Sequence, residues 1–286
     1  MEKYYSYFAH EKCEYFPCHK GANSSDFNCL FCYCPLYVLG ENCGGNYRYL
    51  SNGTKDCSEC LFPHFRLNYE AVTQRFQEIV DKMNQDSTIA YYDEHAEDFA
   101  KNTKDVNFHD MQERFLRDLN TGARILDFGC GAGRDTKYFL EKGYQVDALD
   151  GSKKLCEIAE KNTGISVICQ RFESFYSEEC YDGIWACASL LHLPMSRLEV
   201  VLQNLSHALK KDGRMYLSFK YGTSEGERNG RYFTDMTKEK FMLLLYENLQ
   251  LKIEDEWISA DVRSGRENEK WWNIILIKCT KNKKMY

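Results

Sequence analysis

One stretch of this chain, residues 124–134, has the pattern of a buried strand that breaks into a glycine turn and opens a helix. It reads Arg-Ile-Leu-Asp-Phe-Gly-Cys-Gly-Ala-Gly-Arg. A second apolar run ends at Asp150, which puts a carboxylate beside the turn if the two strands are parallel neighbours. Backbone amides, a helix N-terminus and an acid at one sheet edge suit a nucleoside with a charged tail. The sequence therefore predicts a pocket for an adenosine-type cofactor.

The spacing of the glycines narrows the choice of cofactor. A dinucleotide turn needs a small residue where this chain has Arg134. Asp127 followed by glycines at 129, 131 and 133 instead resembles motif I of the class I S-adenosylmethionine (SAM) dependent methyltransferases. The resemblance implies that the glycines approach the methionine part of SAM, that Asp127 orients its amine and that Asp150 binds the ribose hydroxyls. The full set of implied cofactor contacts is Asp127, Gly129, Gly131, Gly133, Asp150, Phe172, Ala186 and Tyr92.

The order of elements after the turn predicts an α/β fold. Helical patterns at 153–162 and 195–210 alternate with short apolar runs at 165–169, 181–189 and 214–219, which favours a doubly wound parallel sheet. Two strand patterns, 251–259 and 271–279, then follow without a helix between them. We expect a Rossmann-like methyltransferase sheet of five parallel strands plus a terminal antiparallel hairpin. The resemblance covers about residues 88–281 and extends to uncharacterised bacterial methyltransferases through 185–192, Trp-Ala-Cys-Ala-Ser-Leu-Leu-His.

Composition excludes some function classes. No run approaches the roughly 18 uninterrupted apolar residues of a membrane helix, and the first residues lack the apolar core of a signal peptide. We therefore expect a soluble, cytoplasmic protein with no membrane partner. The net charge of −6 does not favour a nucleic acid partner, since proteins that neutralise a phosphate backbone usually present a basic face.

Cysteine is the second strong signal, because eight of the fourteen lie before residue 61. In a reducing compartment such density favours metal over disulfides, and two C-x-x-C pairs supply the tight spacing that zinc uses. The candidate ligands are Cys13, Cys18, Cys29, Cys32, Cys34, Cys43, Cys57, Cys60 and His64. Eight thiolates suit two zinc ions and four would suit one, so the count and the pairing stay open. An iron–sulfur cluster is a rival without a familiar run of cysteines in this sequence.

The same segment resembles the cysteine-rich small domain family, a metal-binding module without an assigned function. The residues that carry this resemblance are 13–19, 28–37, 43–46 and 55–64. We expect a small metal-stapled domain over 1–66, a linker helix within 67–87 and a methyltransferase domain over 88–286. Apolar residues at helical spacing predict helices at 68–85, 88–102 and 107–119, and the resemblance implies that the latter two cap the cofactor, with Tyr91 or Tyr92 facing it.

Methyl transfer needs few catalytic residues, because the protein mainly aligns the acceptor with the methyl group. His192 follows a strand at the ligand edge and is the candidate general base, although it could equally cap the next helix. Residues 220–233 hold three glycines among paired charges and predict a mobile substrate lid, in which Arg228, Arg231 and Tyr232 meet an anionic or polar substrate. A solvated loop with internally paired charges is the alternative. Arg263 and Arg266 could join the same rim.

Three function classes remain open. A SAM-dependent methyltransferase acting on a small molecule is favoured by the acidic composition and by the absence of the motifs of amino-directed and cytosine-directed nucleic acid enzymes. An RNA or protein methyltransferase whose zinc module recognises the macromolecule is the alternative. A non-catalytic sensor of SAM or metal is disfavoured, because Asp127, Gly129, Gly131 and Asp150 are all present. The sequence names neither the acceptor atom nor the oligomeric state.

Overall fold

The computed structural model describes residues 4–51, 53–245, 250–263 and 265–279, with the backbone alone for 84–86. The chain divides into two compact units, residues 1–83 and 84–286. This division falls inside the 67–87 stretch where the sequence predicts a linker helix. No helix in the described ranges has both the length and the apolar character needed to cross a membrane.

The first unit has little regular structure. Its regular segments are mostly short 3-10 turns and one two-stranded ribbon. Leu36, Leu39, Cys43 and Val72 form its small apolar core. Its elements are η1 (Tyr4–Ser6), η2 (Ser24–Asp26), η3 (Pro35–Cys43), β1 (Arg48–Tyr49), β2 (Lys55–Asp56), η4 (Phe62–His64), η5 (Arg66–Asn68) and α1 (Tyr69–Thr73). A core this small needs further cross-links to be stable.

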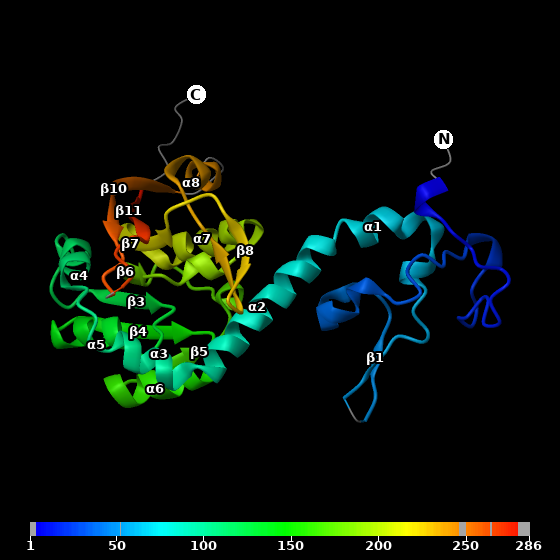
Figure 1. The fold of residues 1–286 in the computed structure, drawn as a ribbon, viewed down its shortest axis with the longest axis horizontal. Helices are drawn as coiled ribbons and strands as arrows, with labels where there is room; N and C mark the ends of the chain where they lie inside the picture. The colour runs from blue at the N-terminus through cyan, green and yellow to red at the C-terminus, as the bar shows by residue number, and fades with distance from the viewer. Residues whose placement is uncertain (1–3, 52, 246–249, 264, 280–286) are drawn as a thin grey trace. The chain divides into compact units, whose positions relative to one another are not determined.

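The second unit is built on a seven-stranded sheet in the order β10-β11-β7-β6-β3-β4-β5 (Figure 1). Strands β3 to β7 are parallel, whereas β11 pairs antiparallel with both β7 and β10. The prediction of five parallel strands plus a terminal hairpin is confirmed. The strands are β3 (Arg124–Phe128), β4 (Gln145–Asp150), β5 (Val167–Cys169), β6 (Tyr181–Ala186), β7 (Leu209–Lys220), β10 (Leu251–Ala260) and β11 (Lys270–Lys278).

Alternation along the strands divides the core between the two faces of the sheet. On β3, Leu126 belongs to the apolar cluster that includes Leu198 and Leu202, whereas Ile125 belongs to the cluster that includes Phe115 and Phe139. Buried strands of this kind show apolar residues on both faces, as parallel sheets do. The helices that cover them are α3 (Ala96–Thr103), α4 (His109–Leu116), α5 (Arg134–Glu141), α6 (Lys153–Thr163), α7 (Met195–Ala208) and α8 (Lys238–Leu245).

The helix boundaries before the sheet differ from the predicted ones. The sequence predicts helices at 68–85 and 88–102, but α2 runs without a break over Phe76–Glu94, and α3 begins after His95. Residues 76–94 contain no glycine or proline to end a helix, so the true break comes at His95, whose ψ of 19° leaves the helical region.

The predicted lid also differs from the expectation. Residues 225–234 form a two-stranded hairpin, β8 (Glu225–Arg228) and β9 (Arg231–Thr234), rather than a loop. Asn229 and Gly230 connect the strands, with φ angles of 52° and 75°. Two central residues with positive φ are the mark of the type I′ turn, whose twist matches that of the flanking strands.

Candidate active site

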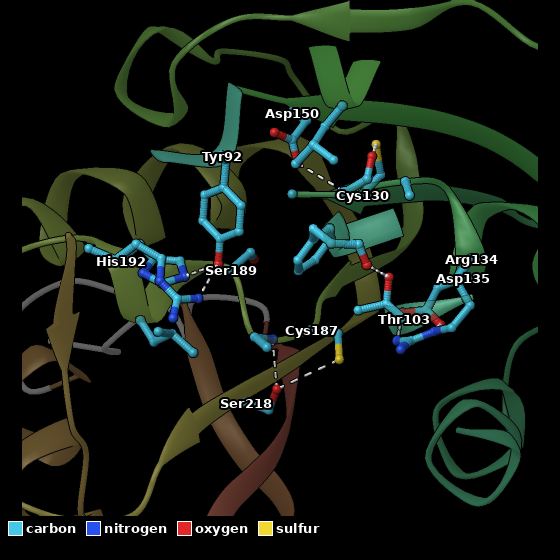
Figure 2. A pocket seen from close by; sticks show the side chains of 18 of the residues that line it. Tyr92, Thr103, Cys130, Arg134, Asp135, Asp150, Cys187, Ser189, His192 and Ser218 are labelled. Atoms are coloured by element: carbon cyan, nitrogen blue, oxygen red, sulfur yellow. Dashed lines mark hydrogen bonds and ion pairs between the residues drawn. The ribbon is translucent and has the colours of Figure 1, made fainter. Parts of the chain in front are cut away.

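A large cavity lies in the second unit at the carboxyl ends of the parallel strands, where open α/β sheets bind ligands (Figure 2). Of the residues predicted for cofactor, catalysis and substrate, those that line it are Gly129, Gly131, Asp150, Phe172, Tyr92, His192 and Arg231. The others predicted for the same roles, Asp127, Gly133, Ala186, Arg228 and Tyr232, are not among its lining residues.

The glycine turn between β3 and α5 leaves room for a ligand only because it lacks side chains. Gly129 has a φ of 85°, and a Cβ atom there would lie 2.3 Å from Cβ of Ser189. Gly131 has a φ of 55°, and its Cβ would lie 2.9 Å from Cε1 of Phe99. Any other residue would strain the backbone and push these neighbours into the cavity. The turn is therefore a backbone cradle, the geometry that close approach to a cofactor requires.

Asp150 ends β4 beside this cradle. Its Oδ2 accepts a hydrogen bond from the Gly131 amide at 2.9 Å, and its Oδ1 accepts one from the Ser152 amide at 2.9 Å. Burial raises the pKa of Asp150, although these amides oppose the shift. The carboxylate is fixed in place and keeps lone pairs toward the cavity for a hydroxyl-bearing ligand.

Helix α2 is held against the same corner by Asp93. Its Oδ1 accepts hydrogen bonds from Ser152 Oγ at 2.6 Å and from the Lys154 amide at 3.1 Å. On the same helix, Ile89, one turn before Asp93, and Tyr92, directly before it, line the cavity. The start of α6 and the cap helix are thus joined through one carboxylate.

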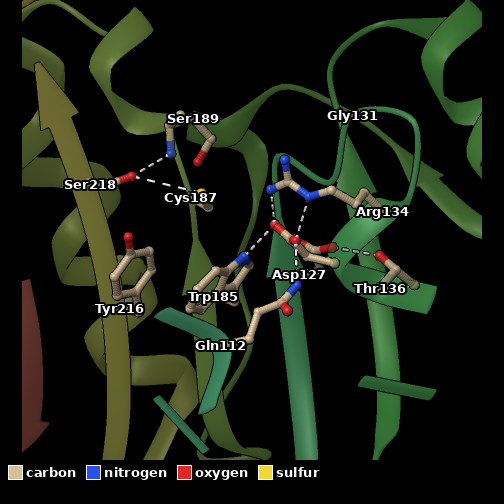
Figure 3. A network of polar contacts seen from close by, with 12 residues as sticks. Gln112, Asp127, Gly131, Arg134, Thr136, Trp185, Cys187, Ser189, Tyr216 and Ser218 are labelled. Carbon is tan, nitrogen blue, oxygen red and sulfur yellow. Dashed lines mark hydrogen bonds and ion pairs between the residues drawn. The ribbon is translucent and has the colours of Figure 1, made fainter. Parts of the chain in front are cut away.

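Asp127 lies in a buried polar network behind the turn (Figure 3). Thr136 donates a 2.5 Å hydrogen bond to its Oδ2, and burial together with the negative charge of Asp135 raises the pKa of Asp127. Arg134 donates two hydrogen bonds to Asp135, and Gln112 and Trp185 donate one each. Asp127 therefore supports the cradle from within the fold, while Arg134 and Asp135 reach the cavity.

His192 has both ring nitrogens engaged. Nδ1 lies 2.7 Å from the carbonyl oxygen of Tyr232, which can only accept, so Nδ1 carries the proton. Nε2 then accepts from the Tyr92 hydroxyl at 2.8 Å (Figure 2). The same hydroxyl accepts from Arg231 Nη1 at 3.3 Å. Burial, followed by the nearby positive charge of Arg231, lowers the pKa of His192 to about 4 despite the Tyr232 carbonyl. His192 is a neutral imidazole of fixed tautomer and does not cap α7.

The two hairpin arginines have different surroundings. Arg228 forms a bidentate ion pair with Asp235, at 2.8 and 2.5 Å. Arg231 stands over the Tyr91 ring at 4.6 Å, and its buried Nε has no hydrogen-bond partner among the described residues. Tyr232 turns its hydroxyl to Glu225, 3.0 Å away, and contributes its backbone instead. Arg231 is thus the predicted substrate residue that the fold aims into the cavity.

Sequence reasoning missed several residues of the lining. Trp271 and Asn273 of β11, Ser218 of β7 and Phe108 before α4 all reach it. Their positions depend on how the terminal hairpin and the cap helices fold over the sheet edge, and no motif marks them. Arg263 and Arg266 line the cavity as the sequence suggests, with Arg263 paired to Asp261 at 2.9 and 2.5 Å.

The predicted metal ligands all lie in the first unit. Six of them line a second cavity there: Cys32, Cys34, Cys43, Cys57, Cys60 and His64. Within the described ranges, no three His, Cys, Asp or Glu side chains are already gathered into a metal site. All eight sulfurs are free thiols, so the donor chemistry that zinc prefers is present.

Two protein families match separate parts of this chain. Residues 4–87 match the cysteine-rich small domain, and residues 125–213 match a methyltransferase domain family. Part of the second unit therefore matches a methyltransferase domain. More particularly, the chain joins such a domain to a cysteine-rich small domain in one polypeptide.

Curated relatives support the same assignment. A methyltransferase of Streptomyces halstedii is 26% identical over 111 residues, which is 35% of this chain and 39% of the relative. A ubiquinone biosynthesis O-methyltransferase of Xylella fastidiosa is 29% identical over 105 residues, which is 34% of this chain and 42% of the relative. The chain thus spans about two fifths of the length of these relatives.

Solved structures share the fold. The 1,6-didemethyltoxoflavin-N1-methyltransferase of Burkholderia thailandensis aligns with a TM-score of 0.56 at 20% identity, over 67% of this chain and 87% of that one. The magnesium protoporphyrin IX methyltransferase of Synechocystis PCC 6803, with bound S-adenosylhomocysteine (SAH), aligns with a TM-score of 0.56 at 16% identity, over 68% and 99%. At these identities the likeness concerns the Rossmann-like architecture alone.

Proposed function

We propose that this protein transfers a methyl group from SAM to a small, anionic acceptor. The observation that carries the proposal is a single cavity that runs from the glycine cradle and Asp150 to a basic, aromatic far end. The cradle fits the cofactor, because close backbone approach at Gly129 and Gly131 is what a Cβ atom would prevent. When bound, SAM supplies an electrophilic methyl group on a sulfonium.

At the cofactor end of the cavity, only a few side chains would contact SAM. Asp150 binds the ribose hydroxyls, since its carboxylate is fixed by two amides and faces the cavity. Phe172 and Tyr92 supply apolar walls that exclude water. Three further predicted residues do not contact the cofactor, but shape the glycine turn and the strand end: Gly133, Asp127 and Ala186.

The acceptor end supports an anionic substrate. Six cationic residues line the cavity, against four acidic ones, in a chain whose net charge is −6. Most of the cations have acidic partners, whereas Arg231 forms no ion pair with a carboxylate in the described part of the chain. A half-buried guanidinium without a counter-ion favours a ligand that brings a carboxylate or phosphate. Trp271 and Phe233 add aromatic surface beside it.

His192 is the candidate general base, and its contacts set the route of the proton. Only Nε2 has a lone pair, and that atom already accepts from Tyr92. A proton leaving an acceptor hydroxyl or amine would therefore pass to the Tyr92 oxygen as the Tyr92 proton moves to His192. Alignment and exclusion of water supply the remainder of the rate enhancement.

Transfer of labelled methyl groups tests the proposed function. Purified protein is incubated with methyl-tritiated SAM and a cell extract that has been separated into small molecules, RNA and protein. We expect label in the small-molecule fraction and its retention on an anion exchanger. Label confined to RNA or protein would favour the alternative acceptor classes, which no comparison supports at present. Asp150→Asn serves as the control with an impaired cofactor site.

For the first unit we propose zinc, held by thiolates of the cysteine-rich small domain. The free thiols, the small core and the family match support this assignment. We also propose a cytoplasmic location, because reduced cysteines at this density suit a reducing compartment. Zinc content of the purified protein, measured by mass spectrometry of the metal, checks the first point.

A further inference from the structure

Four of the eight cysteines surround one cavity in the first unit. Cys34, Cys43, Cys57 and Cys60 all line it, and we name them the inner set. A Cβ atom on Gly45 would lie 2.7 Å from Sγ of Cys60 and 3.9 Å from Sγ of Cys43, so these two sulfurs approach the same glycine. Cys57 and Cys60 are joined through the backbone, since the Cys60 amide donates to the Cys57 carbonyl at 2.9 Å.

The remaining four cysteines form a second neighbourhood, the outer set of Cys13, Cys18, Cys29 and Cys32. The backbone of His10 links two of them, since its amide donates to Cys29 Sγ at 3.3 Å and its carbonyl accepts from the Cys13 amide at 3.0 Å. Cys32 also lines the inner cavity, but its backbone ties it to the outer set, since its amide donates to the Cys29 carbonyl at 3.3 Å.

The two sets differ in burial. Cys43 and Cys60 of the inner set are buried, whereas Cys18 and Cys32 of the outer set are exposed. The inner set also has a cation beside it, because Lys55 is only 7% exposed and lines the same cavity as these four cysteines. Nζ of Lys55 donates to the Gly40 carbonyl at 2.7 Å and stands 4.6 Å from the centre of the Tyr47 ring. A buried ammonium needs an anion nearby, and the described residues give it thiols rather than a carboxylate.

We infer that the cysteine-rich unit binds two zinc ions, one on the inner set and one on the outer set, with Lys55 as the counter-charge of the inner site. This inference rests on the proposal that the unit binds zinc. Each ion would take four thiolates, and up to four protons leave the thiols as the metal–sulfur bonds form. Because neither set is yet gathered into a metal site, binding has to draw its sulfurs together.

His64 stays outside both sets. Its Nδ1 hydrogen bonds to the Asn28 carbonyl at 3.0 Å, and its ring is stacked on Phe27 with 4.6 Å between the centroids. Nε2 of His64 remains open among the described residues, but the four thiols of the inner set already complete the tetrahedral coordination of one zinc ion, which leaves His64 a packing role beside the inner cavity. We therefore expect His64→Gln to keep both metal ions.

The division of the eight cysteines into an inner and an outer set is tested by double substitutions, each of which removes two thiols. We expect two zinc ions per full-length wild-type chain, one in C29S/C32S and one in C57S/C60S, because each pair destroys a single site. The cross pair C32S/C57S removes the same number of sulfurs but should lose both ions. C156S/C169S, with both cysteines in the second unit, is the control and should keep two.

Cobalt substitution gives an independent readout. The thiolate-to-cobalt absorption should halve in either within-set variant and vanish in the cross pair. Circular dichroism and SAH binding show whether each variant remains folded in its second unit. Equal metal content in all three double variants, or loss of one ion in His64→Gln, would overturn the partition. A wild-type chain that binds no zinc or cobalt would instead refute the zinc proposal itself.

The role of Lys55 is tested by release of metal to a chelator. We expect two phases, with the exposed outer site losing its ion first. Lys55→Gln should weaken the inner site about tenfold or more, the usual effect of removing an outer-shell partner of a metal ligand. Lys20→Gln removes an exposed lysine of the same unit and should leave both phases unchanged. If Lys55→Gln releases metal from the inner site at the wild-type rate, Lys55 is not the counter-charge of that site.

Discussion

Arg228 and Arg231 lie three residues apart on one hairpin, yet only Arg231 lines the cavity and lacks a carboxylate partner among the described residues. Arg231→Gln should therefore raise the KM for the acceptor by about tenfold or more, since a lost charged hydrogen bond costs about 1.5–3 kcal/mol. Arg228→Gln breaks an ion pair with Asp235 outside the cavity and should change the KM little. SAH affinity, measured by calorimetry, should be the same in both. Equal KM values would contradict this role of Arg231.

The neutral state of His192 predicts a pH dependence of stability. Its pKa falls from the ordinary 6.5 to about 4, because of burial and then of the charges of Arg231, Lys220 and Arg228. Above about 6.5 the group is neutral in both states and costs nothing. As the pH falls toward 4 the unfolded chain binds a proton that the folded one does not, so up to about 1.4 kcal/mol of stability is lost per pH unit.

The matched variant is His192→Gln, which has no titrating group at this position. Denaturant unfolding at several pH values should show the wild-type advantage shrinking between pH 6.5 and 4, while acid effects elsewhere in the fold cancel. A difference that stays constant over this range would mean that His192 is not held neutral.

At the level of single residues, sequence reasoning succeeds where a backbone conformation demands one residue type. Gly129 and Gly131 are such positions, and Asp150 follows from its place at a strand end. Sequence reasoning does not predict the role of a side chain when that role depends on a partner far away in the sequence. Nothing near His192 in the chain reveals that Tyr92, a hundred residues earlier, donates to its Nε2.

Among the elements, the β8–β9 hairpin carried a local signal. Asn229-Gly230 between two strand-forming runs is a strong hairpin pattern. The charged residues and glycines around it instead led to the prediction of a loop. The parallel strands, by contrast, were predictable because their apolar runs are short, separate and bounded by turns. The boundary of α2 was not, since no breaker residue stands near its predicted end.

The attachment of α2 to the cofactor corner can be tested through Asp93. Asp93→Ala removes the acceptor for Ser152 Oγ and the Lys154 amide, and so loosens the helix that supplies Ile89 and Tyr92. We expect SAH affinity to fall severalfold, because two hydrogen bonds of about 1 kcal/mol each hold this wall. Glu94→Ala changes the exposed neighbour on the same helix and should have no effect. Unaltered SAH binding in Asp93→Ala would show that the wall does not depend on this contact.

For the molecule as a whole, the structure predicts that metal and cofactor act independently. Every described residue that lines the active-site cavity lies at or after Thr88, within the second unit. A strong chelator should therefore unfold the first unit, seen as a loss of aromatic circular dichroism, and leave SAH affinity unchanged. A shortened chain that begins at Phe76, which keeps α2 whole, should bind SAH equally well. Loss of SAH binding in either experiment would mean that the two units form one functional body.

The fixed chain of donors from Arg231 through Tyr92 and His192 to the Tyr232 carbonyl gives the cavity a built-in spectroscopic reporter. Because the Nδ1 proton is locked, the nitrogen resonances of His192 should be those of a single tautomer rather than an average of two. An acceptor that takes Arg231 or the Tyr92 hydroxyl for itself would leave Nε2 with a weaker hydrogen bond and shift its resonance. Arrival of an acceptor can thus be observed by nuclear magnetic resonance with SAH in place, before any methyl group moves.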